Sequence, residues 1–158
     1  MDGDHWVRWI GTSRHPICKV CISSNALITS ILTPTRAMGY KVIGIDITDI
    51  ALEEAKNCGA DHVFNSMNDK DWQKKIVELT DGGVAAAVNF TASKRSYDDA
   101  PAIIKPGLGL LMIVGIPRQP LELNALDIAL GRYRVKGSNN GSKYSFPDFY
   151  LWSLTLNS

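Results

Sequence analysis

The residue with the clearest chemical use in this chain is an aspartate that closes a short apolar run. Val42 to Asp46 reads Val-Ile-Gly-Ile-Asp, which predicts a buried strand ending in a carboxylate. At the carboxyl end of the second strand of a nucleotide-binding α/β sheet, such an acid accepts hydrogen bonds from a ribose diol and repels the extra phosphate of NADP. We therefore expect Asp46 to bind the ribose of NAD.

Other groupings that could do chemistry are weak. Cys18-Lys-Val-Cys21 has the spacing of a zinc-ligand pair, but zinc takes about four ligands and no second pair or suitably placed histidine pair follows. No pattern indicates a Ser-His-Asp triad or a pair of catalytic carboxylates. We expect neither a catalytic residue nor a metal ligand set in this chain.

The elements that would position Asp46 alternate between strand and helix. Strands are expected at 41–47, 61–65, 84–90, 108–115 and 133–136, and helices at 50–58, 69–80 and 96–104. The nearly unbroken apolar run 108–115 is typical of a strand that is covered on both faces. This alternation predicts an α/β fold with a doubly wound parallel sheet of Rossmann type. Another α/β domain without a nucleotide site remains an alternative.

Composition and charge exclude several classes of function. The chain has 158 residues, 45% of them hydrophobic, and a formal net charge of +1. These values fit one domain and give no electrostatic basis for binding nucleic acid or an anionic membrane. The first residues lack the regions of a signal peptide, and the interrupted apolar run 26–32 is too short to span a bilayer. Three cysteines do not form a disulfide framework, so a cytoplasmic location is expected.

Five short segments carry a family resemblance. They begin at Ala37 (Ala-Met-Gly-Tyr-Lys-Val-Ile-Gly-Ile-Asp), Asn57 (Asn-Cys-Gly-Ala-Asp-His-Val-Phe-Asn), Leu79 (Leu-Thr-Asp-Gly-Gly-Val), Leu111 (Leu-Met-Ile-Val-Gly-Ile-Pro) and Val135 (Val-Lys-Gly-Ser). In this order and spacing they resemble the cofactor domain of the zinc-dependent, medium-chain alcohol dehydrogenases. The resemblance covers residues 37–142 and implies a partial NAD-binding Rossmann domain there. It also implies a longer, homo-oligomeric parent enzyme that transfers hydride between an alcohol or aldehyde and NAD.

The resemblance assigns cofactor contacts to particular residues. Asp46 matches the ribose-binding acid, whereas Ala51 stands where the family has a lysine, which removes one ribose contact. The matches near the nicotinamide end are Thr91, Val114, Gly115, Ile116, Ser138 and Asn140. Among them, 114–116 match the backbone segment that contacts the nicotinamide amide. Apart from Asp46, each match has a structural alternative as a core residue, a strand-ending glycine or a turn former.

The family's Gly-rich turn between its first strand and first helix is missing from this chain. Its glycines let backbone amides approach a pyrophosphate at a helix N-terminus, but residues 1–36 contain no such turn and Gly11 is isolated. We therefore expect an incomplete sheet that lacks its first, central strand. Low stability and weak NAD affinity would follow.

The codons of the N-terminal segment suggest why the turn is missing. Read one nucleotide later, Trp6-Val7 must encode glycine (GGG) and Trp9-Ile10 must encode glycine (GGA). The other codons from Trp6 onward permit the series Gly-Cys-Gly-Gly-Leu-Gly-His-Leu-Ala, in which these forced glycines are the first and the fourth residue. That series matches the family's turn and first helix. We interpret residues 1–36 as a non-family segment, an out-of-frame exon plus a retained intron, and residues 143–158 as an unmatched tail.

The leading hypothesis is a fragment of an NAD-dependent alcohol dehydrogenase that carries only the cofactor-binding domain. The family's catalytic zinc and substrate pocket belong to a domain that this chain does not contain, so we expect the isolated chain to be inactive. One alternative is a non-catalytic nucleotide-binding or interaction module. Another is a class I methyltransferase, which also has an acid after its second strand. The segments 114–117 and 59–64 favour the dehydrogenase.

Overall fold

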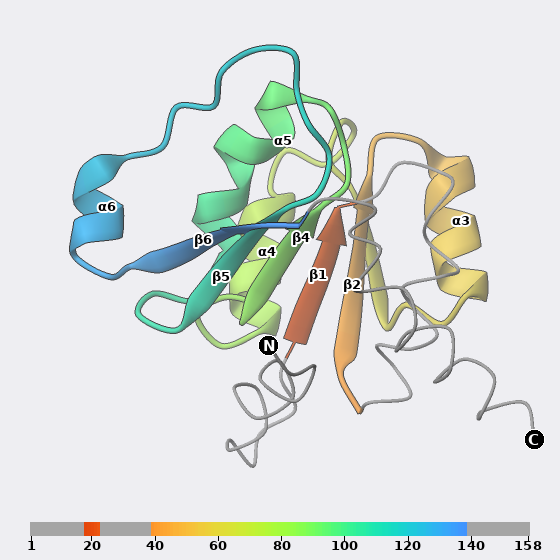
Figure 1. The fold of residues 1–158 in the computed structure, drawn as a ribbon. Coiled ribbons are helices and arrows are strands. Elements are labelled where there is room, and N and C mark those ends of the chain that lie inside the picture. Colours follow the sequence, from red (N-terminus) through yellow and green to blue (C-terminus); the bar gives the residue numbers. More distant parts are fainter. Residues whose placement is uncertain (1–17, 23–38, 139–158) are drawn as a thin grey trace, which may run out of the picture. The chain divides into compact units, whose positions relative to one another are not determined.

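A computed structural model describes residues 18–22 and 39–138, and Figure 1 shows their arrangement. The described strands form one six-stranded sheet with the order β3-β2-β1-β4-β5-β6, and all of its pairings are parallel. The strands are β1 (Cys18–Ile22), β2 (Lys41–Asp46), β3 (His62–Asn65), β4 (Ala86–Asn89), β5 (Gly109–Ile113) and β6 (Tyr133–Gly137). The order reverses at β1, as in a doubly wound sheet of Rossmann type, which confirms the expected fold class.

The centre of the sheet differs from the expectation. β1 lies between β2 and β4, with Val20 opposite both Ile43 and Ala87 in register, so a strand fills the place expected to be vacant. Parallel pairing is made by backbone groups, which is why a segment outside the family pattern can serve as this strand. The glycines of the family's phosphate-binding turn remain missing, because the sequence has none between Gly11 and Gly39.

Helices cover both faces of the sheet. On one face, α3 (Asp49–Asn57) contributes Ala51 and Ala55 to an apolar cluster with Val42 of β2. On the other face, α4 (Trp72–Leu79) and the 3-10 helix η1 (Ala100–Ile103) pack with Ile43 of β2. Successive residues of a strand point to opposite faces, so the neighbours Val42 and Ile43 serve two separate clusters.

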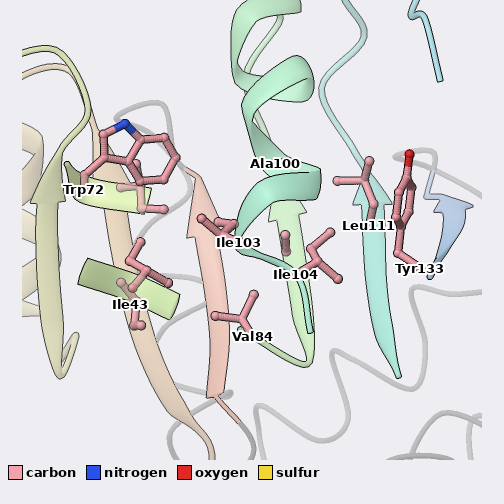
Figure 2. Close-up of a cluster of buried hydrophobic side chains, with 11 residues drawn as sticks. Ile43, Trp72, Val84, Ala100, Ile103, Ile104, Leu111 and Tyr133 are labelled. Atoms are coloured by element: carbon pink, nitrogen blue, oxygen red, sulfur yellow. The ribbon is translucent and has the colours of Figure 1, made fainter. Parts of the chain in front are cut away.

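The larger cluster is the main core of the described residues. It joins the sheet to the helices through side chains that are at most 5% exposed, among them Ile43, Trp72, Ile76, Leu111 and Tyr133. Figure 2 shows Trp72 beside the strand that carries Ile43, with Ile103 farther across the sheet and Leu111 and Tyr133 at the opposite side of the cluster. Burial of this apolar surface supplies most of the free energy that holds the sheet and its helices together.

Small residues set how closely α3 approaches the sheet. A Cβ placed on Gly44, in the middle of β2, would lie 3.2 Å from the Cβ of Ala55 and 3.4 Å from a methyl group of Val63. Glycine and alanine therefore allow a close approach between helix and strand. This contact fixes α3, and with it the loop that follows Asp46.

Several element boundaries differ from those expected. The helix expected at 96–104 is divided into α5 (Lys94–Asp99) and η1, where Pro101 has no N–H to continue α-helical hydrogen bonding. A short helix that was not expected, α6 (Ala125–Ala129), begins after Asn124, whose side chain accepts a hydrogen bond from the backbone of Leu126 at 3.0 Å.

Residues 16–137 group into one unit, whereas Ser138 belongs to a second unit whose other residues lie outside the described ranges. Across residues 18–22 and 39–138, no helix is long and apolar enough to cross a membrane.

Candidate functional site

The carboxyl ends of the parallel strands meet at one edge of the sheet. Asp46 ends β2, Asn89 ends β4, and Val114 follows β5 at this edge. In Figure 1 the arrowheads of β1, β2 and β4 point the same way, with β1 between the other two. Ligands of doubly wound sheets bind outside the carboxyl ends of the strands, at the point where the order reverses.

Asp46 is held in a fixed orientation by the residue two positions on. Its side chain is 8% exposed, and Oδ1 accepts hydrogen bonds from both the backbone N–H and the hydroxyl of Thr48, each at 2.9 Å. The other carboxylate oxygen, Oδ2, has no hydrogen-bond partner among the described residues. A buried carboxylate with one unpaired oxygen is suited to accept hydrogen bonds from a ligand diol.

Thr48 shows how the local chain is organised around Asp46. It occupies the N-cap position of α3, yet its side chain makes no cap hydrogen bond and donates to Asp46 instead. Thr48 was not among the site residues expected from the sequence. A hydroxyl residue two positions after an acidic strand end was the available signal.

An exposed apolar side chain follows the acid. Ile47 is 61% exposed, and an aliphatic surface beside a ribose-binding acid can pack against the flat face of a purine. Ala51, in the first turn of α3, is buried with Val42 and Ala55. The loss of a ribose contact at this position stays a prediction.

The end of β4 is organised around a buried amide. Asn89 is 0% exposed, and its Oδ1 accepts hydrogen bonds from the backbone N–H and the hydroxyl of Thr91, each at 2.9 Å. Its Nδ2 donates to the hydroxyl of Ser96 at 2.8 Å. Thr91 thus lies just after β4, and its hydroxyl points to Asn89 within the fold.

The segment after β5 lies against the end of β4. The N–H groups of Val114 and Gly115 both donate to the carbonyl of Asn89, at 3.0 Å each. A Cβ on Gly115 would lie 2.2 Å from the carbonyl oxygen of Thr91, so glycine is required for this close approach. Ile116 then turns outward and is 75% exposed.

Tyr97 of α5 connects these two segments. Its buried hydroxyl donates toward the carbonyl oxygens of Asn89, at 3.1 Å, and of Gly115. Burial raises the pKa of the Tyr97 phenol above its ordinary value of 10.0, because the charged form would lose its hydration. The hydroxyl therefore stays protonated and remains a donor at neutral pH.

The structure brings some predicted site residues together and leaves others apart. Thr91 and 114–116 are adjacent, whereas Asp46 lies on the other side of β1. With neighbouring strands about 4.8 Å apart, β2 and β4 are separated by roughly 10 Å, so a ligand that used both sites would cross β1. Ser138 is exposed directly after β6, and Asn140 lies outside the described residues, so the roles of both stay predictions.

The described part of the chain shows no metal site. Within 18–22 and 39–138, no three histidine, cysteine, aspartate or glutamate side chains are grouped so that they could hold a metal ion. A catalytic zinc, which needs three protein ligands, does not fit this part of the chain.

Comparison with known proteins decides the family. The family model described as "Zinc-binding dehydrogenase" matches residues 31–155. The chain belongs to this family. Its members are dehydrogenases, so the family is one of oxidoreductases, in agreement with the resemblance seen in the sequence.

Two curated alcohol dehydrogenases of Geobacillus stearothermophilus are similar to this chain. Both are 34% identical to it, over 108 and 110 residues, and each match covers 68% of this chain and 31% of the relative. The matched part therefore spans about a third of the length of these relatives.

Solved structures give the same result. Benzyl alcohol dehydrogenase from Acinetobacter calcoaceticus is 29% identical, with a TM-score of 0.76 over 90% of this chain and 40% of that chain. The alcohol dehydrogenase of Aeropyrum pernix is 26% identical, with a TM-score of 0.76 over 94% of this chain and 43% of that chain.

Proposed function

We propose that this chain carries the NAD-binding part of an alcohol dehydrogenase, and that Asp46 selects NAD over NADP. The observation that supports the proposal most strongly is that Oδ2 of the buried Asp46 carboxylate, at the switch point of the sheet, has no hydrogen-bond partner in the part of the chain that the structure describes. A ribose diol would donate to this oxygen, whereas a 2′-phosphate would place negative charge beside it.

The other proposed contacts combine the family resemblance, which assigns Thr91 and 114–116 to the nicotinamide, with the positions of these residues at the strand ends. Ile47 would pack against the adenine, and the backbone around 114–116 would receive the nicotinamide amide beside Thr91. Ser138 and Asn140 are proposed to border the nicotinamide because of the family resemblance alone. When bound, NAD supplies a two-electron hydride acceptor, and the residues of this chain orient it.

The missing Gly-rich turn limits the expected affinity. The sequence has no glycine between Gly11 and Gly39, and in the family the glycines let backbone amides approach the pyrophosphate closely. We propose weak NAD binding, with a Kd of about 1 mM, which corresponds to about 4 kcal/mol.

We propose that the parent reaction is hydride transfer between an alcohol or aldehyde and NAD in a homo-oligomeric enzyme. The isolated chain would be inactive, because its described residues hold no cluster of three histidine, cysteine, aspartate or glutamate side chains that could bind the zinc that polarises the alcohol oxygen in the family. Formation of NADH from NAD and ethanol by the purified chain would contradict this.

Binding titrations separate this proposal from its rivals. The chain, observed by NMR, is titrated with NAD, NADP and S-adenosylmethionine. Saturable shifts with NAD at resonances of Asp46 and its loop, and at least tenfold weaker binding of NADP, are expected. Binding of S-adenosylmethionine alone would favour a methyltransferase, and binding of none of the three would refute a nucleotide site.

We further propose that residues 1–36 arise from an out-of-frame exon and a retained intron. The motivation is the pair of forced glycine codons at Trp6-Val7 and Trp9-Ile10. Genomic and transcript sequencing across codons 1–40 should spell the Gly-rich turn in the next frame, followed by a removable intron. A genomic sequence without that turn would refute the proposal.

A further inference from the structure

We propose that Tyr97 and Asn89 are positioning residues that hold the backbone of 114–116 in place to receive the nicotinamide amide. This inference rests on the proposed NAD site and adds two residues that do not themselves touch the cofactor. Neither was among the site residues expected from the sequence.

Hydrogen bonds from two segments converge on Asn89. Its backbone carbonyl accepts from the N–H groups of Val114 and Gly115, each at 3.0 Å, and from the hydroxyl of Tyr97 at 3.1 Å. Its fully buried side chain accepts two hydrogen bonds from Thr91. One residue therefore sets the positions of both segments assigned to the nicotinamide end.

The Tyr97 hydroxyl ties down the other side of the same turn. It also reaches the carbonyl of Gly115, the same residue whose N–H is bound to Asn89. Both polar groups of Gly115 are thus committed, and the contact between Gly115 and the Thr91 carbonyl leaves no space for a Cβ. The peptide planes on either side of Gly115 cannot rotate without breaking buried hydrogen bonds.

This network is separate from the ribose site. Asp46 is oriented by Thr48 on the other side of β1, and its hydrogen bonds to Thr48 involve neither Asn89 nor Tyr97. Loss of the Tyr97 hydroxyl should therefore affect the nicotinamide half of NAD and leave the adenosine half unchanged. A residue that only stabilised the fold would affect both halves equally.

The test replaces Tyr97 by phenylalanine, which keeps the buried ring and removes the hydroxyl. Tyr133→Phe is the matched control, because Tyr133 is also buried, at 5% exposed, and its hydroxyl has no hydrogen-bond partner among the described residues. Affinities of the chain are measured for NAD and for ADP-ribose, which lacks the nicotinamide. Amide hydrogen exchange at Val114 and Gly115 is measured without ligand.

In Tyr97→Phe we expect exchange at both amides to become about tenfold faster and NAD to bind about tenfold more weakly, with ADP-ribose unchanged. Tyr133→Phe should change neither. An equal loss for NAD and ADP-ribose, or unchanged binding of both, would overturn the positioning role. If the unmodified chain bound neither ligand, the proposed function itself would be wrong, and the positioning role would fall with it.

Discussion

Asp46→Asn is the substitution that most directly tests how this chain would choose its cofactor. Asparagine has nearly the shape of aspartate, and its amide oxygen can still accept the two hydrogen bonds that Thr48 donates at 2.9 Å. The unpaired oxygen, however, is replaced by an amide donor, and the negative charge is lost. The fold should lose only about 1 kcal/mol, the net value of a typical hydrogen bond.

The effect on the ligand follows from the same geometry. A hydrogen bond from a ribose hydroxyl to a charged acceptor contributes about 1.5–3 kcal/mol, so NAD should bind roughly 10- to 100-fold more weakly. The 2′-phosphate of NADP would no longer face a like charge. Two unit charges 4 Å apart repel by about 4 kcal/mol near a protein surface, and relief of part of this should strengthen NADP binding roughly tenfold.

The assay is the ratio of the two dissociation constants, measured by titration of each variant with NAD and NADP. Asp127→Asn serves as the control, because it removes one negative charge from a carboxylate of α6 that is not at the end of β2. Asp127 pairs with Arg132 at 2.8 Å. It should leave the ratio unchanged. If Asp46→Asn weakened both cofactors equally, or altered neither, Asp46 would not be the ribose acid and the reasoning would be refuted.

Three further predictions concern the scaffold. Gly115→Ala should lower the free energy of unfolding by about 1–3 kcal/mol or more, because its Cβ would lie 2.2 Å from a backbone oxygen. The control Gly137→Ala should leave that free energy, measured by urea unfolding, nearly unchanged, because no atom lies within 4 Å of its Cβ. Ile76→Ala, at a fully buried position, should lower the free energy of unfolding by about 2–5 kcal/mol. Leu79→Ala, at a position 46% exposed on the same helix, should lower it much less. Equal losses for the two variants would mean that α4 does not face the core as described. Burial raises the pKa of Tyr97, so the folded state keeps the phenol proton to a higher pH than the unfolded state does. The free energy of unfolding should therefore fall as the pH rises above 10.0, and Tyr97→Phe should make this fall less steep.

Several of the strands and helices could be predicted from local sequence patterns. Local hydrophobic patterns are clear in β2, α4 and β5. Each pattern matches the burial of one or both faces of its element. The position of Asp46 at the end of β2 could be predicted in the same way, because an acid closes the apolar run, whereas its role as the ribose acid stays a prediction.

The central strand could not be predicted in this way. Cys18–Ile22 is only five residues long and stands outside the family resemblance, and it becomes β1 through pairing with β2 and β4. The paired residues of β2 lie more than twenty positions after β1 in the chain, and those of β4 lie still farther away. The information that defines β1 as a strand is therefore not local. Propensity is a weak guide where such pairing decides the structure.

The same distinction applies to the candidate site. The sequence by itself determined the acid at the end of β2, the glycine after β5 and the absence of a Gly-rich turn, because each depends on residue type at one place in the chain. Only the tertiary structure decided that Thr48 orients Asp46, that the Thr91 hydroxyl faces inward, and that Tyr97 joins Asn89 to Gly115. The physical reason is that a buried polar group must find its partner in the folded chain. The Gly115 carbonyl comes within reach of the Tyr97 hydroxyl only when β4 and β5 align in parallel.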